Sequence, residues 1–182
     1  MNSHCILEMK IAITGKMCSG KSSIANLLVE EDNRFQIYSF GQKVKDVAKD
    51  LFNMKEKDRT LLTSIGTKMR EINPDVWVNY VIQQTEGETH CIVDDLRYQN
   101  EYEALSKAGF KIIQLILDPQ IQEERIKKVY SNNYKDHLSN LNHISEKNEF
   151  QWVEDEDPLI IDSGKETILD IMDKIKNKYF SL

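Results

Sequence analysis

One short motif constrains the fold of this chain more than any other part of its sequence. The residues Gly15–Ser22 read GKMCSGKS and match the pattern G-x-x-x-x-G-K-S. A β-branched run, Met9–Thr14, directly precedes the motif, and apolar residues at helical spacing follow it over Lys21–Glu31. The order strand, glycine-rich turn and helix wraps backbone N–H groups around phosphate oxygens. The sequence therefore predicts a phosphate-binding loop (P-loop) within an α/β fold.

Each residue type in this loop has a separate task. Glycine lets the backbone turn its N–H groups inward, and the helix that follows directs its positive end at the same place. Lys21 is expected to reach the β- and γ-phosphates, and the Ser22 hydroxyl to bind Mg²⁺. Lys16 adds a cation that either meets the nucleotide or is simply solvated. The predicted nucleotide contacts are Gly15, Lys16, Cys18, Ser19, Gly20, Lys21, Ser22 and Ser23.

Strands and helices alternate along the rest of the sequence. Further strands are predicted at 35–40, 91–93, 111–117 and 159–161. Helical spacing of apolar residues predicts helices over 44–52, 58–72, 98–108, 119–130 and 167–179, and one more that begins at Pro74. Two consecutive helices over 58–85 interrupt the alternation, as does the polar, Asn-rich stretch 131–148, which indicates a mobile excursion. We expect a single domain spanning residues 1–182.

Composition excludes several classes of protein. The chain has 24 basic and 30 acidic residues and a net charge of −6, which disfavours a nucleic-acid-coating role. Its apolar runs are far shorter than the ~20 residues that span a bilayer, and residues 1–10 lack the features of a secretory signal. Three cysteines without C-x-x-C spacing favour a reducing compartment and no zinc site. Composition therefore predicts a cytoplasmic protein that binds neither nucleic acid nor membrane, and it leaves open both the chemistry and whether the protein is a monomer or a homodimer.

A second signal follows the predicted strand Cys91–Val93, where Asp94 and Asp95 stand side by side. Ligands of open α/β sheets bind at the carboxyl ends of the strands, so these carboxylates should lie beside the phosphates. One of them is expected to orient Mg²⁺ and the other to hold a substrate hydroxyl. We assign Asp94 to magnesium and Asp95 to the reaction, although the pattern itself leaves the order of the two open.

Two basic regions suggest how a second substrate is held. The helix before the polar excursion carries Arg125, Lys127 and Lys128, which either close over phosphates as part of a lid or form a solvated face paired with Glu123 and Glu124. In the helical insertion, Arg70 and Trp77 could supply a guanidinium for a phosphate and a stacking face for a base. The alternative for Trp77 is a place in the core.

Further motifs follow the P-loop in a fixed order. They are Phe40-x-x-x-x-Lys45, Gly66-Thr67-x-x-Arg70, Pro74-x-x-Trp77 and Asp95-x-Arg97-x-x-Asn100-Glu101. This series resembles the deoxynucleoside monophosphate kinases of the bacteriophage and large-virus type, over most of the chain from about Lys10 to the C-terminal helix. The resemblance implies the adenylate-kinase-like P-loop NTPase fold, with a five-stranded parallel sheet flanked by helices. It also implies a helical NMP-binding region at about 41–85 and a lid at about 125–150.

The resemblance implies a reaction and a set of residue roles. The γ-phosphoryl group of ATP would pass to a deoxynucleoside 5′-monophosphate (dNMP) with Mg²⁺ as cofactor, in the cytoplasm or, for a viral protein, in that of the host. Lys21, Asp95 and a lid residue, Arg125, would be catalytic. Ser163 and Gly164 match the loop that flanks adenine, although the family often has a neutral polar residue in place of Asp162, and residues 143–146 match a short family motif. The acceptor would contact Lys45, Arg70, Trp77, Asp95, Arg97 and Glu101.

Other functions share parts of this pattern. Animal phosphomevalonate kinases have a similar skeleton with an acidic-x-Arg strand end, and dephospho-CoA kinase fits the Asp95–Glu101 motif less well. A switch that binds ATP without an acceptor is a rival of another class. The chain has no N-K-x-D motif after a strand, which disfavours a GTPase. Its four scattered histidines offer no evident general base, in keeping with an acceptor phosphate that is already anionic.

Overall fold

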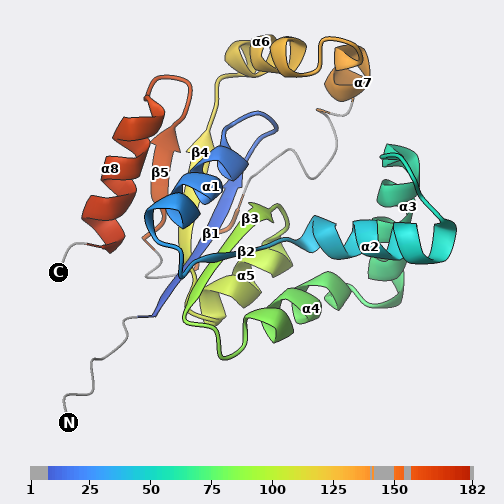
Figure 1. Cartoon of the computed structure of the whole chain (residues 1–182), viewed down its shortest axis with the longest axis horizontal. Coiled ribbons are helices and arrows are strands. Elements are labelled where there is room, and N and C mark those ends of the chain that lie inside the picture. The colour runs from blue at the N-terminus through green and yellow to red at the C-terminus, as the bar shows by residue number, and fades with distance from the viewer. Residues whose placement is uncertain (1–7, 140, 142–149, 154–156, 181–182) are drawn as a thin grey trace.

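The computed structural model describes residues 8–139, 141, 150–153 and 157–180. Its centre is one sheet of five parallel strands in the order β2-β3-β1-β4-β5 (Figure 1). This confirms the predicted five-stranded parallel sheet. The strands are β1 (Met9–Gly15), β2 (Gln36–Tyr38), β3 (His90–Leu96), β4 (Lys111–Ile116) and β5 (Leu159–Asp162).

The sheet is buried on both faces, which explains why its strands are apolar almost without interruption. Because side chains alternate along a strand, neighbouring residues of β1 enter different cores. Ile11 and Ile13 pack with α1 (Lys21–Glu31) and α8 (Ile168–Tyr179) on one face. Ala12 packs on the other face, with α4 (Val76–Thr85) and α5 (Gln99–Lys107).

The helical insertion lies between β2 and β3 and comprises α2 (Phe40–Phe52), α3 (Arg59–Ile72) and α4. Two predicted boundaries were wrong. Strand β2 ends at Tyr38 instead of residue 40, because the Ser39 hydroxyl accepts a hydrogen bond from Gln42 N and so begins α2. Pro74 does not begin a helix, because Val76 N donates to Asn73 O across a turn, and α4 starts at Val76.

The segment after β4 holds α6 (Pro119–Val129) and the short helix α7 (Tyr134–Ser139), so part of the predicted excursion is helical. The family motif at residues 143–146 lies outside the described residues. Before β5, Phe150 and Trp152 pack against the ring of Tyr102 on α5, at centroid distances of 5.7 and 5.2 Å. Within the described part of the chain, no helix is both long enough and apolar enough to cross a lipid bilayer.

Candidate active site

The loop between β1 and α1 is wound too tightly for a side chain at its first residue. A Cβ on Gly15 would lie 2.6 Å from Ser19 Oγ and 2.8 Å from Leu115 O, and the φ of Gly15 is 152°. Gly20 has a φ of 97°, and Cys18 adopts the left-handed region at 62°. L-residues rarely adopt such conformations, and they persist where the surrounding structure fixes them, often at ligand sites. The loop geometry therefore agrees with the predicted phosphate cradle.

The start of α1 is open to an anion. No side chain caps this helix, and its first turn carries no acidic residue, so the positive end of the helix dipole is directed at the loop without a competing carboxylate in that turn. Lys21 is only 9% exposed, and its Nζ donates to Gly15 O at 2.6 Å and to Lys16 O at 2.9 Å. The buried Ser19 Oγ has no hydrogen-bond partner among the described residues. These donors fit the oxygens of a triphosphate.

A bulge in β3 separates the two adjacent aspartates. Val93 pairs with Ala12 and Leu96 with Thr14, so three steps along β3 oppose two steps along β1. The two aspartates lie in this irregular stretch of the strand. Successive side chains of a strand point to opposite faces, and the carboxylates of positions 94 and 95 contact two different helices.

Asp94 belongs to the P-loop side. Its Oδ2 accepts a hydrogen bond from Ser22 Oγ at 2.7 Å. Burial raises the pKa of Asp94 and the neighbouring Asp95 adds to that shift, while the Ser22 hydrogen bond and Lys21 oppose it. The two oxygens of Ser22 and Asp94 are the hard donors that Mg²⁺ prefers, so this pair fits the cation. The described residues hold no group of three acidic, histidine or cysteine ligands.

Asp95 instead holds the start of α2. Its carboxylate accepts hydrogen bonds from Ser39 Oγ at 2.7 Å, Phe40 N at 3.0 Å and Gly41 N at 2.8 Å. A carboxylate at a helix N-terminus satisfies donors that the helix cannot, and it interacts favourably with the helix dipole. The predicted reactive residue is thus engaged by three protein donors, although it still borders the cavity described next.

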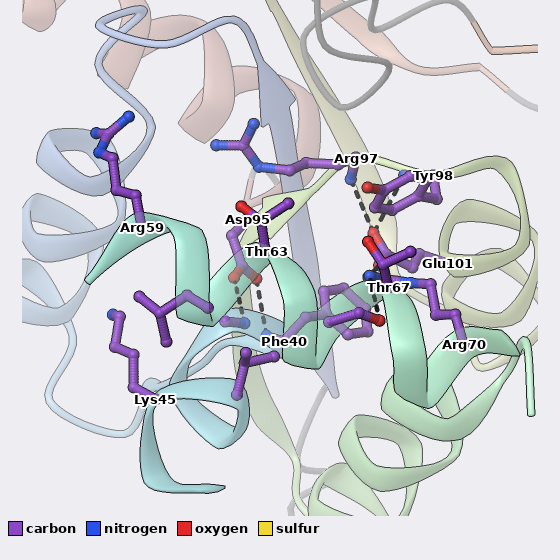
Figure 2. Close-up of a pocket in the computed structure, with 14 residues that line it drawn as sticks. Phe40, Lys45, Arg59, Thr63, Thr67, Arg70, Asp95, Arg97, Tyr98 and Glu101 are labelled. Atoms are coloured by element: carbon purple, nitrogen blue, oxygen red, sulfur yellow. Dashed lines mark hydrogen bonds and ion pairs between the residues drawn. The ribbon is translucent and has the colours of Figure 1, made fainter. Parts of the chain in front are cut away.

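A cavity of about 330 Å³ lies between the end of β3 and the helices α2, α3 and α5. One wall is apolar, with Phe40, Val44 and Leu62. Figure 2 shows the charged side chains that border it, including Arg97 extending over Asp95 from the end of β3. Two of its lining residues are acidic, Asp95 and Glu101, and four are basic: Lys45, Arg59, Arg70 and Arg97. This excess of positive charge stands out in a chain with a net charge of −6.

Glu101 ties two of these arginines together. The residue is 2% exposed, and its carboxylate accepts from Arg70 Nη2 at 3.1 Å, Arg97 N at 3.0 Å and Tyr98 N at 3.1 Å. The Arg70 guanidinium also lies 4.4 Å from the centroid of the Tyr98 ring. Burial raises the pKa of Glu101 to about 7, Asp95 adds to the shift, and the N–H donors and Arg70 oppose it. Glu101, a predicted substrate contact, is therefore a buried residue that holds the Arg70 side chain and the Arg97 backbone in place.

Trp77 does not face the cavity. Its side chain is 3% exposed and belongs to the core between the sheet and α4, and its Nε1 donates to Gly66 O at 3.2 Å. The predicted stacking role was wrong, and the alternative of a core position is correct. The same Gly66 carbonyl accepts a hydrogen bond from Arg70 Nη1 at 3.3 Å. Trp77 therefore contacts, from the core side, the part of α3 that lines the cavity.

Arg125 lies beside the P-loop. Its Nη1 donates to Cys18 O at 3.2 Å and its Nη2 to Ser163 O at 2.7 Å. Gly164 is the next residue, and a Cβ added to it would lie 3.0 Å from Ile121 Cδ1. The fold thus brings α6, the P-loop and the loop after β5 together. Asp162 is engaged by Gly164 N and Lys165.

Lys127 follows the alternative of a solvated helix face. Lys127 pairs with Glu123 at 2.6 Å on a half-exposed face of α6, which agrees with a solvated pair. Lys45, a predicted acceptor contact, borders the cavity. Sequence reasoning missed Arg59, which opens α3 directly after its cap Asp58. A basic residue in the first turn of a helix is electrostatically unfavourable, and that mismatch could have identified it.

Comparisons with known proteins agree with this architecture. The model of a family described as an AAA domain matches residues 11–153. A search of curated proteins found no match. A solved putative kinase from Chloroflexus aurantiacus J-10-fl is 15% identical, with a TM-score of 0.57 over 94% of this chain and 96% of that chain.

Two further solved structures share the fold at similarly low identity. A gluconokinase from Sinorhizobium meliloti 1021 is 14% identical, with a TM-score of 0.55 over 92% of this chain and 89% of its own. A sugar kinase from Janibacter sp. HTCC2649 is 13% identical, with a TM-score of 0.55 over 93% of each chain. At these identities the likeness shows the fold alone. Because the family model covers most of the sheet, the P-loop and the insertion, the chain belongs to the AAA domain family and has the P-loop fold of these kinases.

Proposed function

We propose that the protein transfers the γ-phosphoryl group of ATP to a deoxynucleoside 5′-monophosphate, giving ADP and the diphosphate. The observation that carries the proposal is the cavity at the end of β3, the strand that pairs with the P-loop strand β1, with four basic side chains against two acidic ones. A cavity of about 330 Å³ lies within the usual size range for small-ligand sites, which begins at roughly 300 Å³. The P-loop fold accounts for ATP, and the resemblance to deoxynucleoside monophosphate kinases supplies the class of acceptor.

The charges of the cavity favour a phosphorylated acceptor over a neutral sugar. A sugar hydroxyl has to lose a proton during transfer and needs a nearby base. Each acidic side chain of the lining, Asp95 and Glu101, already accepts three hydrogen bonds from the protein. An acceptor phosphate is anionic near neutral pH and needs positive charge, which Arg70 and Arg97 supply.

The reaction then depends on positioning and charge neutralisation. An oxygen of the acceptor phosphate forms a bond to the γ-phosphorus, and the bond from that phosphorus to the β–γ bridging oxygen breaks, leaving ADP with the electron pair. Lys21 neutralises charge on the transferred group, and Arg125 holds the ATP side of the site. Ser22 and Asp94 would hold Mg²⁺, which would supply further charge neutralisation. The apolar wall at Phe40, Val44 and Leu62 receives the base.

An acceptor panel tests the proposal. The protein is incubated with ATP and Mg²⁺ plus each dNMP in turn, with gluconate and phosphomevalonate as further acceptors, and ADP and the phosphorylated product are both measured. We expect ADP formation that depends on a monophosphate nucleotide. Slow ADP release independent of every acceptor would refute the kinase and favour the ATP-binding switch. Turnover only with gluconate or only with phosphomevalonate would replace the acceptor class.

The substitution Arg97→Ala tests the location of the acceptor. We expect the KM of the nucleotide monophosphate to rise by at least about tenfold, as for the loss of a charged hydrogen bond, while the KM of ATP changes little. Lys107→Ala is the matched control. Lys107 is exposed at the far end of α5, and its substitution by Ala also removes one positive charge. An equal rise in both KM values would place Arg97 outside the acceptor site.

A further inference from the structure

Arg59 connects the acceptor cavity to a segment distant in sequence. It is the first residue of α3 and borders the cavity, where Figure 2 shows its side chain across from Arg97. Its Nη2 lies 2.8 Å from Nδ1 of His137 on α7, 78 residues further along the chain. The contact therefore joins the helical insertion to the segment that follows α6.

The chemistry of the pair fixes the state of the imidazole. A guanidinium stays protonated in proteins and offers only donors, so Nδ1 of His137 has to be the acceptor. The imidazole is then neutral and carries its proton on Nε2. A protonated His137 would instead place two cations in contact and lose the hydrogen bond.

The surroundings of His137 favour the neutral form. The residue is 2% exposed, and its ring stacks on Tyr130 at the end of α6 with a centroid distance of 3.5 Å and an interplanar angle of 18°. Burial lowers the pKa of His137, and Arg59 and Lys57 lower it further, while Asp136 on the same helix opposes them. These are the charged groups from α3, the loop before it and α7 that face the ring.

Arg59 needs such a partner because other cations lie close to it. The pKa of Lys57 is lowered by burial and by the charges of Arg59 and Lys45. Repulsion of this kind favours rotation of a long side chain out into solvent. Among the described residues the guanidinium of Arg59 has no other hydrogen bond, so its remaining donors can meet an anion.

We infer that His137 is a positioning residue that holds the Arg59 guanidinium over the acceptor cavity, so that binding of the acceptor phosphate requires a neutral imidazole. The inference rests on the proposed function and adds a specific residue pair to its acceptor site. Neither residue belongs to the motifs that carry the family resemblance. The pair makes acceptor affinity depend on the placement of α7.

Two substitutions of His137 separate a hydrogen bond from a structural role. His137→Phe keeps the stacked ring but removes the acceptor, and we expect it to raise the KM of the nucleotide monophosphate about tenfold while the KM of ATP stays unchanged. His137→Asn supplies an amide oxygen in place of Nδ1 and should restore most of the affinity. Lys135→Ala, at an exposed position of α7, is the matched control and should behave as the unchanged protein.

The pH profile gives a second readout. Below pH 6.5, the ordinary pKa of the side chain, protonation of His137 should raise the acceptor KM of the unchanged protein. His137→Asn should show only the smaller change caused by the nucleotide phosphate, which titrates near pH ~6. In an Arg59→Ala background, His137→Phe should cause no additional rise in KM.

The outcomes distinguish this inference from the proposed function. Turnover with an acceptor KM that His137→Phe leaves unchanged would overturn the inference alone. A ¹⁵N NMR spectrum showing a proton on Nδ1 of His137 at pH 7.5 would overturn it as well. The absence of ADP formation with every monophosphate would overturn the proposed function and this inference with it.

Discussion

Replacing Glu101 by Gln should change how the stability of the protein depends on pH. The side chain is 2% exposed, and burial raises its pKa from 4.5 to about 7. Glutamine has nearly the same shape and keeps one acceptor oxygen for Arg70 or the N–H groups of Arg97 and Tyr98. The substitution therefore removes a titrating proton with little change in packing.

The sign follows from where the proton resides. Between pH 4.5 and about 7 the folded protein keeps a proton on Glu101 that the unfolded chain has already released. The contribution of Glu101 to the unfolding free energy therefore falls as the pH rises through this window. One pKa unit corresponds to about 1.4 kcal/mol, so the whole shift amounts to about 3 kcal/mol. The stability of the unchanged protein relative to Glu101→Gln should fall by about that amount between pH 4.5 and 7.5.

Urea denaturation of both proteins at pH 5, 6, 7 and 8 measures this difference. Equal m-values would show that the substitution leaves the surface exposed on unfolding unchanged. Glu71→Gln is the matched control, since Glu71 is exposed on α3 and should give a difference that does not vary over this range. A relative stability of Glu101→Gln that stays constant, or moves in the opposite direction, would refute the argument. It would mean that Arg70 and the two N–H donors keep the carboxylate ionised.

Three further substitutions test separate parts of the site. Lys21→Ala should lower kcat by orders of magnitude while the protein stays folded, because it removes a contact to the transferred phosphoryl group, and near-normal kcat would contradict the mechanism. Trp77→Phe should cost about 1–2 kcal/mol of unfolding free energy through the lost bond to Gly66 O while leaving the acceptor KM unchanged. A raised acceptor KM at normal stability would restore the stacking role. Asp94→Asn should raise the Mg²⁺ concentration for half-maximal activity several-fold, and an unchanged Mg²⁺ dependence would remove Asp94 from the metal site.

Local signals explain which parts of the fold could be predicted. The P-loop needs its glycines and its flanking strand and helix within a few residues of one another. Several helix starts are likewise encoded next to the helix, as at Asp58, Asp118 and Thr167, whose side chains accept bonds from the first turn. The apolar strands follow from burial on both sheet faces. These features depend on short stretches of sequence.

The acceptor site was harder to predict because it depends on contacts between distant segments. Asp94 and Asp95 are adjacent in the sequence, yet one contacts Ser22 on α1 and the other the start of α2, and which helix lies on which side of β3 depends on the fold. In the sequence Trp77 fits either a stacking face or a core position, and only the packing of α4 against α3 and α5 puts it in the core. Arg59 was missed because its partner on α7 is 78 residues away.

The attachment of α2 to the sheet also bears on how such a protein can acquire new substrates. All three bonds that Asp95 accepts come from Ser39 and from the backbone of Phe40 and Gly41. Two of those donors are main-chain groups, so the anchorage survives exchange of the side chains that meet the acceptor. Over evolutionary time the residues around the cavity can therefore diversify while α2 stays attached to the sheet and Asp94 stays bonded to Ser22.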